Sequence, residues 1–214
     1  EVSGMLRTVA VNYQKIAADL RLLASGPTGG IGEIMLAPLQ AGSTIMPGKV
    51  NPVMPELLAS VAIQVMGNDL AVNLAAAAGQ LELNAFLPVL ARNLLESVTL
   101  LGEAAVLFTR RCVARLEAAP DRCLSNLEAG YGLVTLLAPY VGYDGAAAIW
   151  QQARERKIPV RAAALASGRF TEEELALILD PRRATAPGIP GAAELRARLE
   201  TRLLAAKDDE KGGA

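Results

Sequence analysis

The segment GSTIMPGKVN, at positions 42–51, gathers side chains that could do chemistry. Ser43 and Thr44 place two hydroxyl groups side by side. Lys49 adds a cation, and Asn51 adds a flat amide that both donates and accepts hydrogen bonds. The two glycines of the segment let the backbone turn, so that successive N–H groups can point into one concavity that favours anions. The combination suits a carboxylate, or an oxyanion that develops during a reaction.

The same residue types also fit a purely structural loop. In that interpretation the serine caps a turn and the lysine extends into solvent, and the residues alone leave both interpretations open. The chain contains 0 histidines, which excludes a Ser-His-Asp triad, a histidine-ligated metal and a histidine base within it. Proton transfer must therefore use Ser, Thr, Tyr, Lys, Asp, Glu or a residue of a partner. The sequence shows no cluster of metal ligands and no cofactor motif, so we expect neither.

Composition predicts an all-α fold. Hydrophobic residues make up 52% of the 214 residues but aromatic residues only 4%, so the apolar side chains are mainly those of Ala, Leu and Val. Ala and Leu are strong helix formers, and small side chains let helices approach closely. The formal net charge of −1 gives no basic excess, so we expect no nucleic-acid partner. Two cysteines are no disulfide framework, which predicts a cytoplasmic protein.

We also expect no membrane partner, because the longest charge-free runs are short and contain Pro or Gly. These runs are residues 34–48 and 129–143. No signal-peptide pattern opens the chain. Residue 1 already lies in a helical apolar pattern without an N-cap, which suggests the C-terminal part of a longer protein.

Long helices are predicted on both sides of the 42–51 segment. The first ends near Ser25, before a Gly-Pro stop signal, and the long connection that follows extends to residue 53. The second helix covers about 54–78 and is apolar around most of its circumference, so we expect it to be buried on all sides. The third covers about 85–117, and the short connection predicts an antiparallel pair.

Shorter helices follow Pro120. They are predicted at about 121–138, 143–156, 159–167 and 171–179, with a final amphipathic helix at 191–206. The helix at 171 has a capping-box pattern, with Thr171 as N-cap and Glu174 three residues later. We predict three parts: a partial helical bundle at 1–118 that carries a loop at 42–53, a small helical domain at 119–190, and a terminal helix with a solvated tail at 191–214.

The segment GSTIMPGKVNPVMPE resembles the active-site signature of the fumarase/aspartase superfamily, a loop of the form G-S-x-x-M-x-x-K-x-N. The segments QVMGNDLAVNLAAAAGQLELNAFLPV and GLVTLLAPYVGYDGAAAI resemble the same family, and the likeness extends to about residue 191. It implies part of the family's central bundle of long helices, followed by its small helical C-terminal domain. The motifs NPVMPE, LQAGS and LDPRRATAPGIPG are similar to those of aspartases rather than fumarases.

The resemblance implies a lyase that converts L-aspartate to fumarate and ammonia through an enediolate-like intermediate, with no cofactor. Ser43 matches the catalytic base, and Thr44 matches a serine that contacts the reacting carboxylate. Lys49 and Asn51 match residues that hold the other carboxylate. Glu56 matches a glutamate near the site, which we expect to contact substrate-binding residues rather than to act as the base. The family forms a homotetramer whose sites combine three regions from different subunits. This chain carries one of the three.

Two positions depart from the family pattern. Thr44 stands where the family has Ser, and Thr28 stands where it usually has an Arg that could brace the loop. Two alternatives to an aspartase stay open. One is a fumarate hydratase of the same architecture, acting on malate and fumarate. The other is an inactive, truncated chain whose long apolar helices only form an assembly core.

Overall fold

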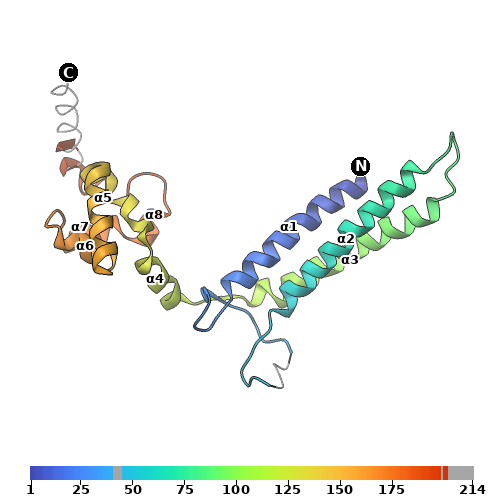
Figure 1. Ribbon diagram of the computed structural model, residues 1–214, viewed down its shortest axis with the longest axis horizontal. Coiled ribbons are helices and arrows are strands. Elements are labelled where there is room, and N and C mark those ends of the chain that lie inside the picture. Colours follow the sequence, from blue (N-terminus) through green and yellow to red (C-terminus); the bar gives the residue numbers. More distant parts are fainter. Residues whose placement is uncertain (41–44, 199, 202–214) are drawn as a thin grey trace. The chain divides into compact units, whose positions relative to one another are not determined.

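The chain folds into two compact units in a computed structural model that describes residues 1–40, 45–198, 200 and 201. The first unit ends at Arg122 and the second begins at Cys123. Regular structure in the described residues is helical except for one pair of two-residue strands, so the predicted all-α class is confirmed (Figure 1). The predicted boundaries at 118/119 and 190/191 stay a prediction.

Three long helices build the first unit: α1 (Val2–Leu23), α2 (Val53–Ala77) and α3 (Leu87–Arg111). Figure 1 shows them side by side, and α2 packs against both α1 and α3. The first two match the predicted helices to within two residues at each end. Ion pairs and hydrogen bonds that join α1 to α2 at both ends of the pair show that these helices run antiparallel.

The third helix is shorter than the predicted 85–117. It ends at Arg111, and a 3₁₀ turn η1 (Val113–Arg115) and strand β2 (Glu117–Ala118) follow it. Strand β2 pairs antiparallel with β1 (Ile34–Met35), in the connection between α1 and α2. Pairing with a segment more than eighty residues away overrides the local helical pattern, which is why the sequence did not show this end.

Helix α2 has one buried face, not the full burial that was predicted. Its buried apolar residues recur every three or four positions, as expected for a single helical face: Met54, Leu58, Ala62 and Val65. On other sides Ile63, Leu70 and Leu74 are 58–64% exposed. Two neighbouring helices cover only part of the circumference of α2, so the prediction of burial on all sides is wrong for this single chain.

Within the described residues, α2 is also the one helix with the length and apolar composition to cross a membrane. Those two properties are weak evidence, because core helices of helical bundles share them. The carboxylate of Asp69, in the second half of α2, lies 3.1 Å from the guanidinium of Arg7 on α1. The ion pair fits a helix that packs against α1.

The second unit is built from short helices: α4 (Pro120–Ala129) at its start, then η2 (Tyr131–Leu136), α5 (Ala138–Arg156), α6 (Val160–Ala166), α7 (Glu172–Ile178) and α8 (Pro181–Ala184). Their core includes the fully buried side chains of Leu137, Ile149, Val160, Leu175 and Ile178. The predicted capping box is confirmed, because Thr171 accepts from the Glu174 N–H and Glu174 accepts from the Thr171 N–H.

Glycines explain where the predicted short helices differ from the observed ones. The predicted helix at 121–138 is two elements, since Gly130 between them has an extended backbone. Helix α5 begins at Ala138, five residues before its predicted start, and Gly142 bends it with a φ of +75°. Of the predicted final helix, 196–198, 200 and 201 are helical, 191–195 form turns, and the rest lies outside the described residues.

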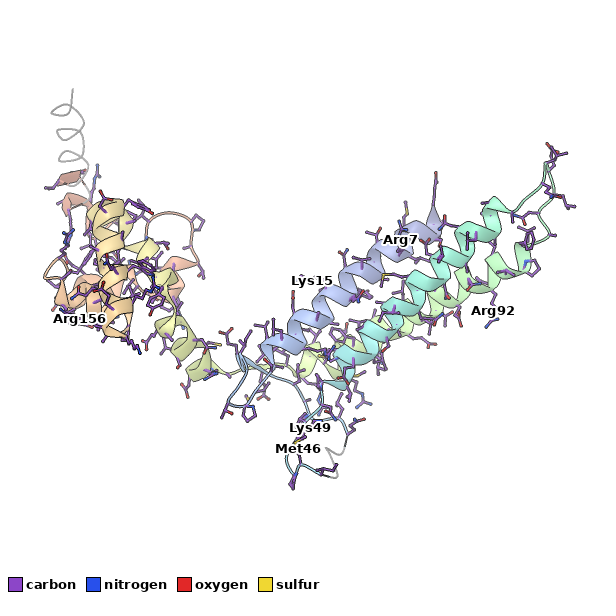
Figure 2. All side chains as sticks on the ribbon, viewed as in Figure 1. Arg7, Lys15, Met46, Lys49, Arg92 and Arg156 are labelled. Carbon is purple, nitrogen blue, oxygen red and sulfur yellow. The ribbon has the colours of Figure 1, made fainter. Side chains whose placement is uncertain are left out.

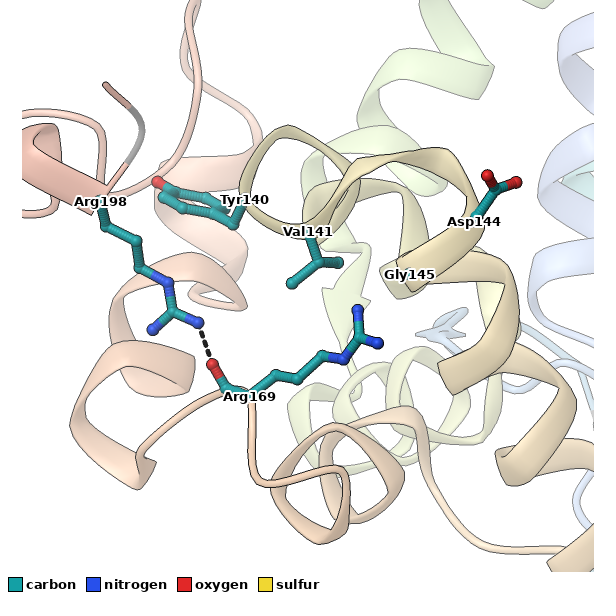
Figure 3. A pocket seen from close by; sticks show the side chains of 6 residues that line it. All are labelled: Tyr140, Val141, Asp144, Gly145, Arg169 and Arg198. Carbon is teal, nitrogen blue, oxygen red and sulfur yellow. Dashed lines mark hydrogen bonds between the residues drawn. The ribbon is translucent and has the colours of Figure 1, made fainter. Parts of the chain in front are cut away.

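A shallow pocket lies on the second unit between α5 and the segment that follows α6 (Figure 3). Its polar groups hold the fold together. The phenol of Tyr140 donates to the Pro190 carbonyl at 2.6 Å, and burial, followed by the charge of Glu194, raises its pKa. Arg198 donates to the carbonyl of Arg169, forms an ion pair with Glu174 and stacks on Phe170.

The acid–base properties of Glu174 agree with a structural role for this pocket. Burial favours the neutral form of Glu174, but the hydrogen bond from Arg198, the Thr171 N–H and the charge of Arg198 together lower its pKa. Asp144 is the carboxylate among the described residues that line the pocket, and it points away from Tyr140 and Arg198 (Figure 3). The pocket therefore offers one uncommitted cation, that of Arg169, among the described residues that line it.

Candidate active site

The predicted site residues divide between described and undescribed parts of the chain. Ser43 and Thr44, the predicted base and its neighbour, lie outside the described residues. Lys49, Asn51 and Glu56 are described, and all three lie at or just before the beginning of α2. Figure 2 labels Met46 and Lys49 on the loop that leads into this helix.

A tight turn presents Lys49 to solvent. Its backbone N–H donates to the carbonyl of Met46 at 3.2 Å, and Gly48 between them has a φ of +82°, which favours glycine. The side chain of Lys49 is exposed, and in the described part of the chain no ion pair engages its ammonium group. A cation held by the backbone and left without a carboxylate partner is available to an anionic ligand.

Asn51 lies directly before α2 and is half-buried. Its carbonyl accepts the N–H of Val53 at 2.9 Å, and Pro52 follows as the N-cap residue. Within this first turn Val53 and Glu56 already donate their N–H groups to the Asn51 and Pro52 carbonyls, and Pro55 has none, so it is the positive end of the helix dipole that favours an anion here. The amide of Asn51 therefore lies where the backbone itself favours an anion.

Glu56 occupies the first turn of α2, where a carboxylate interacts favourably with the helix dipole. One of its oxygens lies 3.7 Å from the guanidinium of Arg21 on α1. Both side chains are nearly half exposed, so water screens this pair and it contributes little to stability. The described partner of Glu56 is thus a cation of α1, and its role as a partner of the substrate-binding residues stays a prediction.

A third cation at this end of the bundle was not predicted. Arg111, the last residue of α3, lines a narrow pocket together with Asn51, Leu36 and Leu39. The pair Arg110–Arg111 is visible in the sequence, but only the antiparallel return of α3 brings it to the start of α2. Arg111 therefore adds a positive charge beside Asn51, and this pocket has no carboxylate among its described lining residues, which suits a negatively charged ligand.

One hydrophobic cluster holds the chain on both sides of the loop. Leu36 and Leu39 pack against it before the loop, and Met54 is buried in it directly after Asn51. The cluster also contains Phe108 and Cys112 of the α3 end. Burial raises the pKa of the Cys112 thiol, so this cysteine stays a neutral packing residue near pH 7. The chain is therefore packed against the same cluster before the loop, at Leu39, and after it, at Met54.

Among the described residues, no group of three or more Asp, Glu or Cys side chains could hold a metal ion. The arrangement is therefore built from cations, an amide and the positive end of a helix. Such groups bind carboxylates and stabilise negative charge that develops during a reaction.

Comparison with known proteins assigns the family. Residues 1–67 match the family described as "Lyase", and residues 133–186 match the one described as "Fumarase C C-terminus". An aspartate ammonia-lyase of Bacillus subtilis (strain 168) is 47% identical over 191 residues, which are 89% of this chain and 40% of that protein. A class II fumarate hydratase of Pseudomonas putida is 45% identical over 89% of this chain and 41% of that protein.

Solved structures agree with these relatives. A "fumarate lyase:delta crystallin" from Brucella melitensis is 49% identical and superposes with a TM-score of 0.82, over 86% of this chain and 40% of that one. A class II fumarase from Schistosoma mansoni is 36% identical with a TM-score of 0.78. The chain belongs to the fumarase/aspartase superfamily of lyases. It spans about two fifths of the length of the relatives that it matches.

Proposed function

We propose that this chain supplies the loop region of an aspartate ammonia-lyase, which converts L-aspartate reversibly to fumarate and ammonia. One observation carries the proposal. In a chain 47% identical to an aspartase, the segment GKVN places a cation without an ion-pair partner among the described residues, and an amide, directly before a helix. The same hydrophobic cluster holds the start of this helix and the chain before the loop. The substrate that fits these groups is a small dicarboxylate.

In the proposed reaction Ser43 takes a proton from the carbon beside one carboxylate of L-aspartate. The electron pair of that C–H bond moves into the carboxylate and gives an enediolate-like dianion. When the dianion collapses, a carbon–carbon double bond forms and the neighbouring C–N bond breaks, releasing ammonia. The extra negative charge of the intermediate is what the site must stabilise more strongly than it binds the substrate.

The described residues match that requirement. Lys49 and Asn51 would hold the carboxylate that does not react, while the start of α2 adds its positive end. Arg111 and Arg21 increase the positive potential around the same place. Thr44 would contact the reacting carboxylate with the hydroxyl that it shares with the serine of the family. The remaining groups of the site would come from other regions of the lyase.

A fumarate hydratase is the second candidate, and one observation favours it. The class II fumarate hydratases are 43–45% identical to this chain, while the two aspartases are 44% and 47% identical. The proton transfer would be the same, with water leaving in place of ammonia. The motif NPVMPE after the loop is our reason for placing the aspartase first.

We further propose that the lyase is a homotetramer whose centre includes the exposed apolar faces of the long helices. Large side chains on these helices are exposed in the single chain, among them Met5 of α1, Leu70 and Leu74 of α2, and Leu95 of α3, at 61–70%. Many large apolar side chains exposed on the long helices of one unit favour an interface with another protein surface. Copies of the same bundle can cover one another's faces.

The assembly is tested by the mass in solution, measured by light scattering on the product of the gene at the length that the gene encodes. We expect about four copies, and we expect the double variant Leu70→Lys, Leu74→Lys to shift the mass toward one copy. Leu165→Lys is the matched control, because it changes an exposed leucine of the second unit. A wild-type mass of one copy, or an unchanged mass in the double variant, contradicts the proposed interface.

The reaction is tested by the ultraviolet absorbance of fumarate formed from L-aspartate and, in parallel, from L-malate. The samples are this chain alone, the gene's product at its encoded length, and a Ser43→Ala variant of each. We expect fumarate from aspartate with the gene's product, and a loss of turnover in Ser43→Ala. Turnover of malate alone would establish the hydratase instead. Absence of fumarate formation from both substrates would favour the inactive scaffold. Thr28 and Thr44 would then be the first positions at which to restore the family's Arg and Ser.

A further inference from the structure

Residues 25–33, between α1 and β1, form a compact bend that leads toward the loop. The N–H of Ile31 donates to the Ser25 hydroxyl at 3.1 Å, and the N–H of Glu33 donates to the Leu23 carbonyl at 3.0 Å. A Cβ at Gly30 would lie 2.3 Å from the backbone of Ser25, so the close approach requires glycine there. These contacts attach the bend to the end of α1.

Arg122 attaches the same bend to the end of the first unit. Its Nε donates to the carbonyl of Ile31 at 2.9 Å and its Nη2 donates to the carbonyl of Gly30 at 2.8 Å. The two bonds use the fork of the guanidinium group to hold two successive peptide units. Gly32 has a φ of +65°, which favours glycine, and a Cβ there would lie 3.7 Å from the Arg122 side chain. Arg122 lies more than ninety residues away in the sequence, so this contact is purely tertiary.

Strand pairing continues the attachment toward the loop. The N–H of Ala119 donates to the Glu33 carbonyl at 2.9 Å, and Ile34 and Met35 pair with Ala118 and Glu117. Leu36 and Leu39 then enter the hydrophobic cluster that also contains Met54. An unbroken series of fixed points therefore extends from Arg122 to the segment directly before the loop.

Thr28, the position where the family usually has an arginine, does not supply this attachment. Its side chain is exposed. The guanidinium that holds the bend in this chain is that of Arg122.

We propose that Arg122 is a positioning residue of the lyase: by clamping the carbonyls of Gly30 and Ile31, it sets where the chain enters the loop opposite Lys49 and Asn51. The proposal rests on the proposed function, because the loop is taken to carry the reacting groups. Misplacement of about 1 Å by a change far from the chemistry can cost about 10²-fold in rate. Arg122 touches no substrate in this role, and its effect acts through the backbone of residues 30–36.

The first test is hydrogen exchange, which needs no activity. In Arg122→Ala we expect amide exchange in residues 30–36 to rise at least tenfold, while the amides of α2 and α3 keep their wild-type rates. Arg115→Ala is the matched control, because Arg115 is an exposed arginine of the neighbouring turn η1. Equal exchange of residues 30–36 in Arg122→Ala and wild type overturns the clamp, whatever reaction the protein performs.

The second test is kinetic and uses the gene's product with whichever substrate the wild type turns over. We expect kcat to fall about 10–10²-fold in Arg122→Ala, with a KM within threefold of wild type. Millimolar ethylguanidinium should restore at least part of the kcat, and Arg122→Lys should lie between Arg122→Ala and wild type. General destabilisation predicts no rescue, because guanidinium compounds weaken folded proteins.

The two failures are distinguishable. If wild type turns over neither aspartate nor malate, the proposed function fails and with it the kinetic role of Arg122. If wild type is active but Arg122→Ala keeps its kcat, or loses it without rescue by ethylguanidinium, the positioning role is overturned while the lyase stands.

Discussion

Replacing Lys49 by alanine is expected to lower kcat/KM for the dicarboxylate about 10–10²-fold, because it removes the cation proposed to bind the carboxylate that does not react, and a hydrogen bond to a charged group contributes about 1.5–3 kcal/mol. Lys49 is held by a turn of its own backbone, and its ammonium has no ion pair in the described part of the chain. Its removal therefore leaves the fold intact. The measurement is fumarate absorbance over a range of substrate concentrations, with circular dichroism to check the fold.

Lys15→Ala is the control for this prediction. Lys15 is an exposed lysine on α1 that already pairs with Asp19, so its loss changes the net charge equally without reaching the candidate site. Lys49→Arg keeps the charge but replaces a compact ammonium by a broad fork, and we expect it to recover only part of the activity. A kcat/KM for Lys49→Ala within threefold of that for Lys15→Ala would remove Lys49 from the site.

Sequence patterns predict those structural features whose interacting residues lie close together in the chain. The helices at 2–23 and 53–77 were visible because apolar residues recur at helical spacing and Gly-Pro and Pro mark their limits. The Thr171 capping box was visible because its two partners lie three residues apart. Lys49 and Asn51 were found because they share one short segment with glycine. Each of these features is complete within a few turns of chain.

Features that join distant segments were missed for one physical reason. The early end of α3 follows from the pairing of β2 with β1, and the clamp of Arg122 joins it to carbonyls near residue 30. Arg111 reaches the candidate site only because α3 runs back along α2. The exposure of α2 was missed for a related reason, since hydrophobicity shows that a surface needs covering but not which chain covers it.

Removal of the Asp69 carboxylate is expected to be the most destabilising of the polar changes considered. Its oxygens accept from the Ser3 hydroxyl at 2.5 Å and from the Asn73 amide at 3.1 Å, and pair with Arg7 at 3.1 Å. Asp69 is only 3% exposed. Asp69→Ala leaves the buried Ser3 hydroxyl without this acceptor and breaks the ion pair, which together cost about 2–3 kcal/mol. The half-exposed Arg7 returns to water, so the full cost of a stranded buried charge does not arise.

Asp19→Ala is the matched control, because it breaks an ion pair within α1, that of Asp19 with Lys15, in which both side chains are at least half exposed. Such a pair contributes less than about 1 kcal/mol.

Urea unfolding followed by circular dichroism measures the stability of both variants. The single tryptophan, Trp150, lies in the second unit, so its fluorescence reports that unit separately. We expect the helical signal of Asp69→Ala to unfold at lower urea while the Trp150 transition moves less. Equal stabilities of Asp69→Ala and Asp19→Ala would show that Asp69 contributes no more to stability than an exposed carboxylate does. The contacts that align α1 with α2 would then have to be apolar ones.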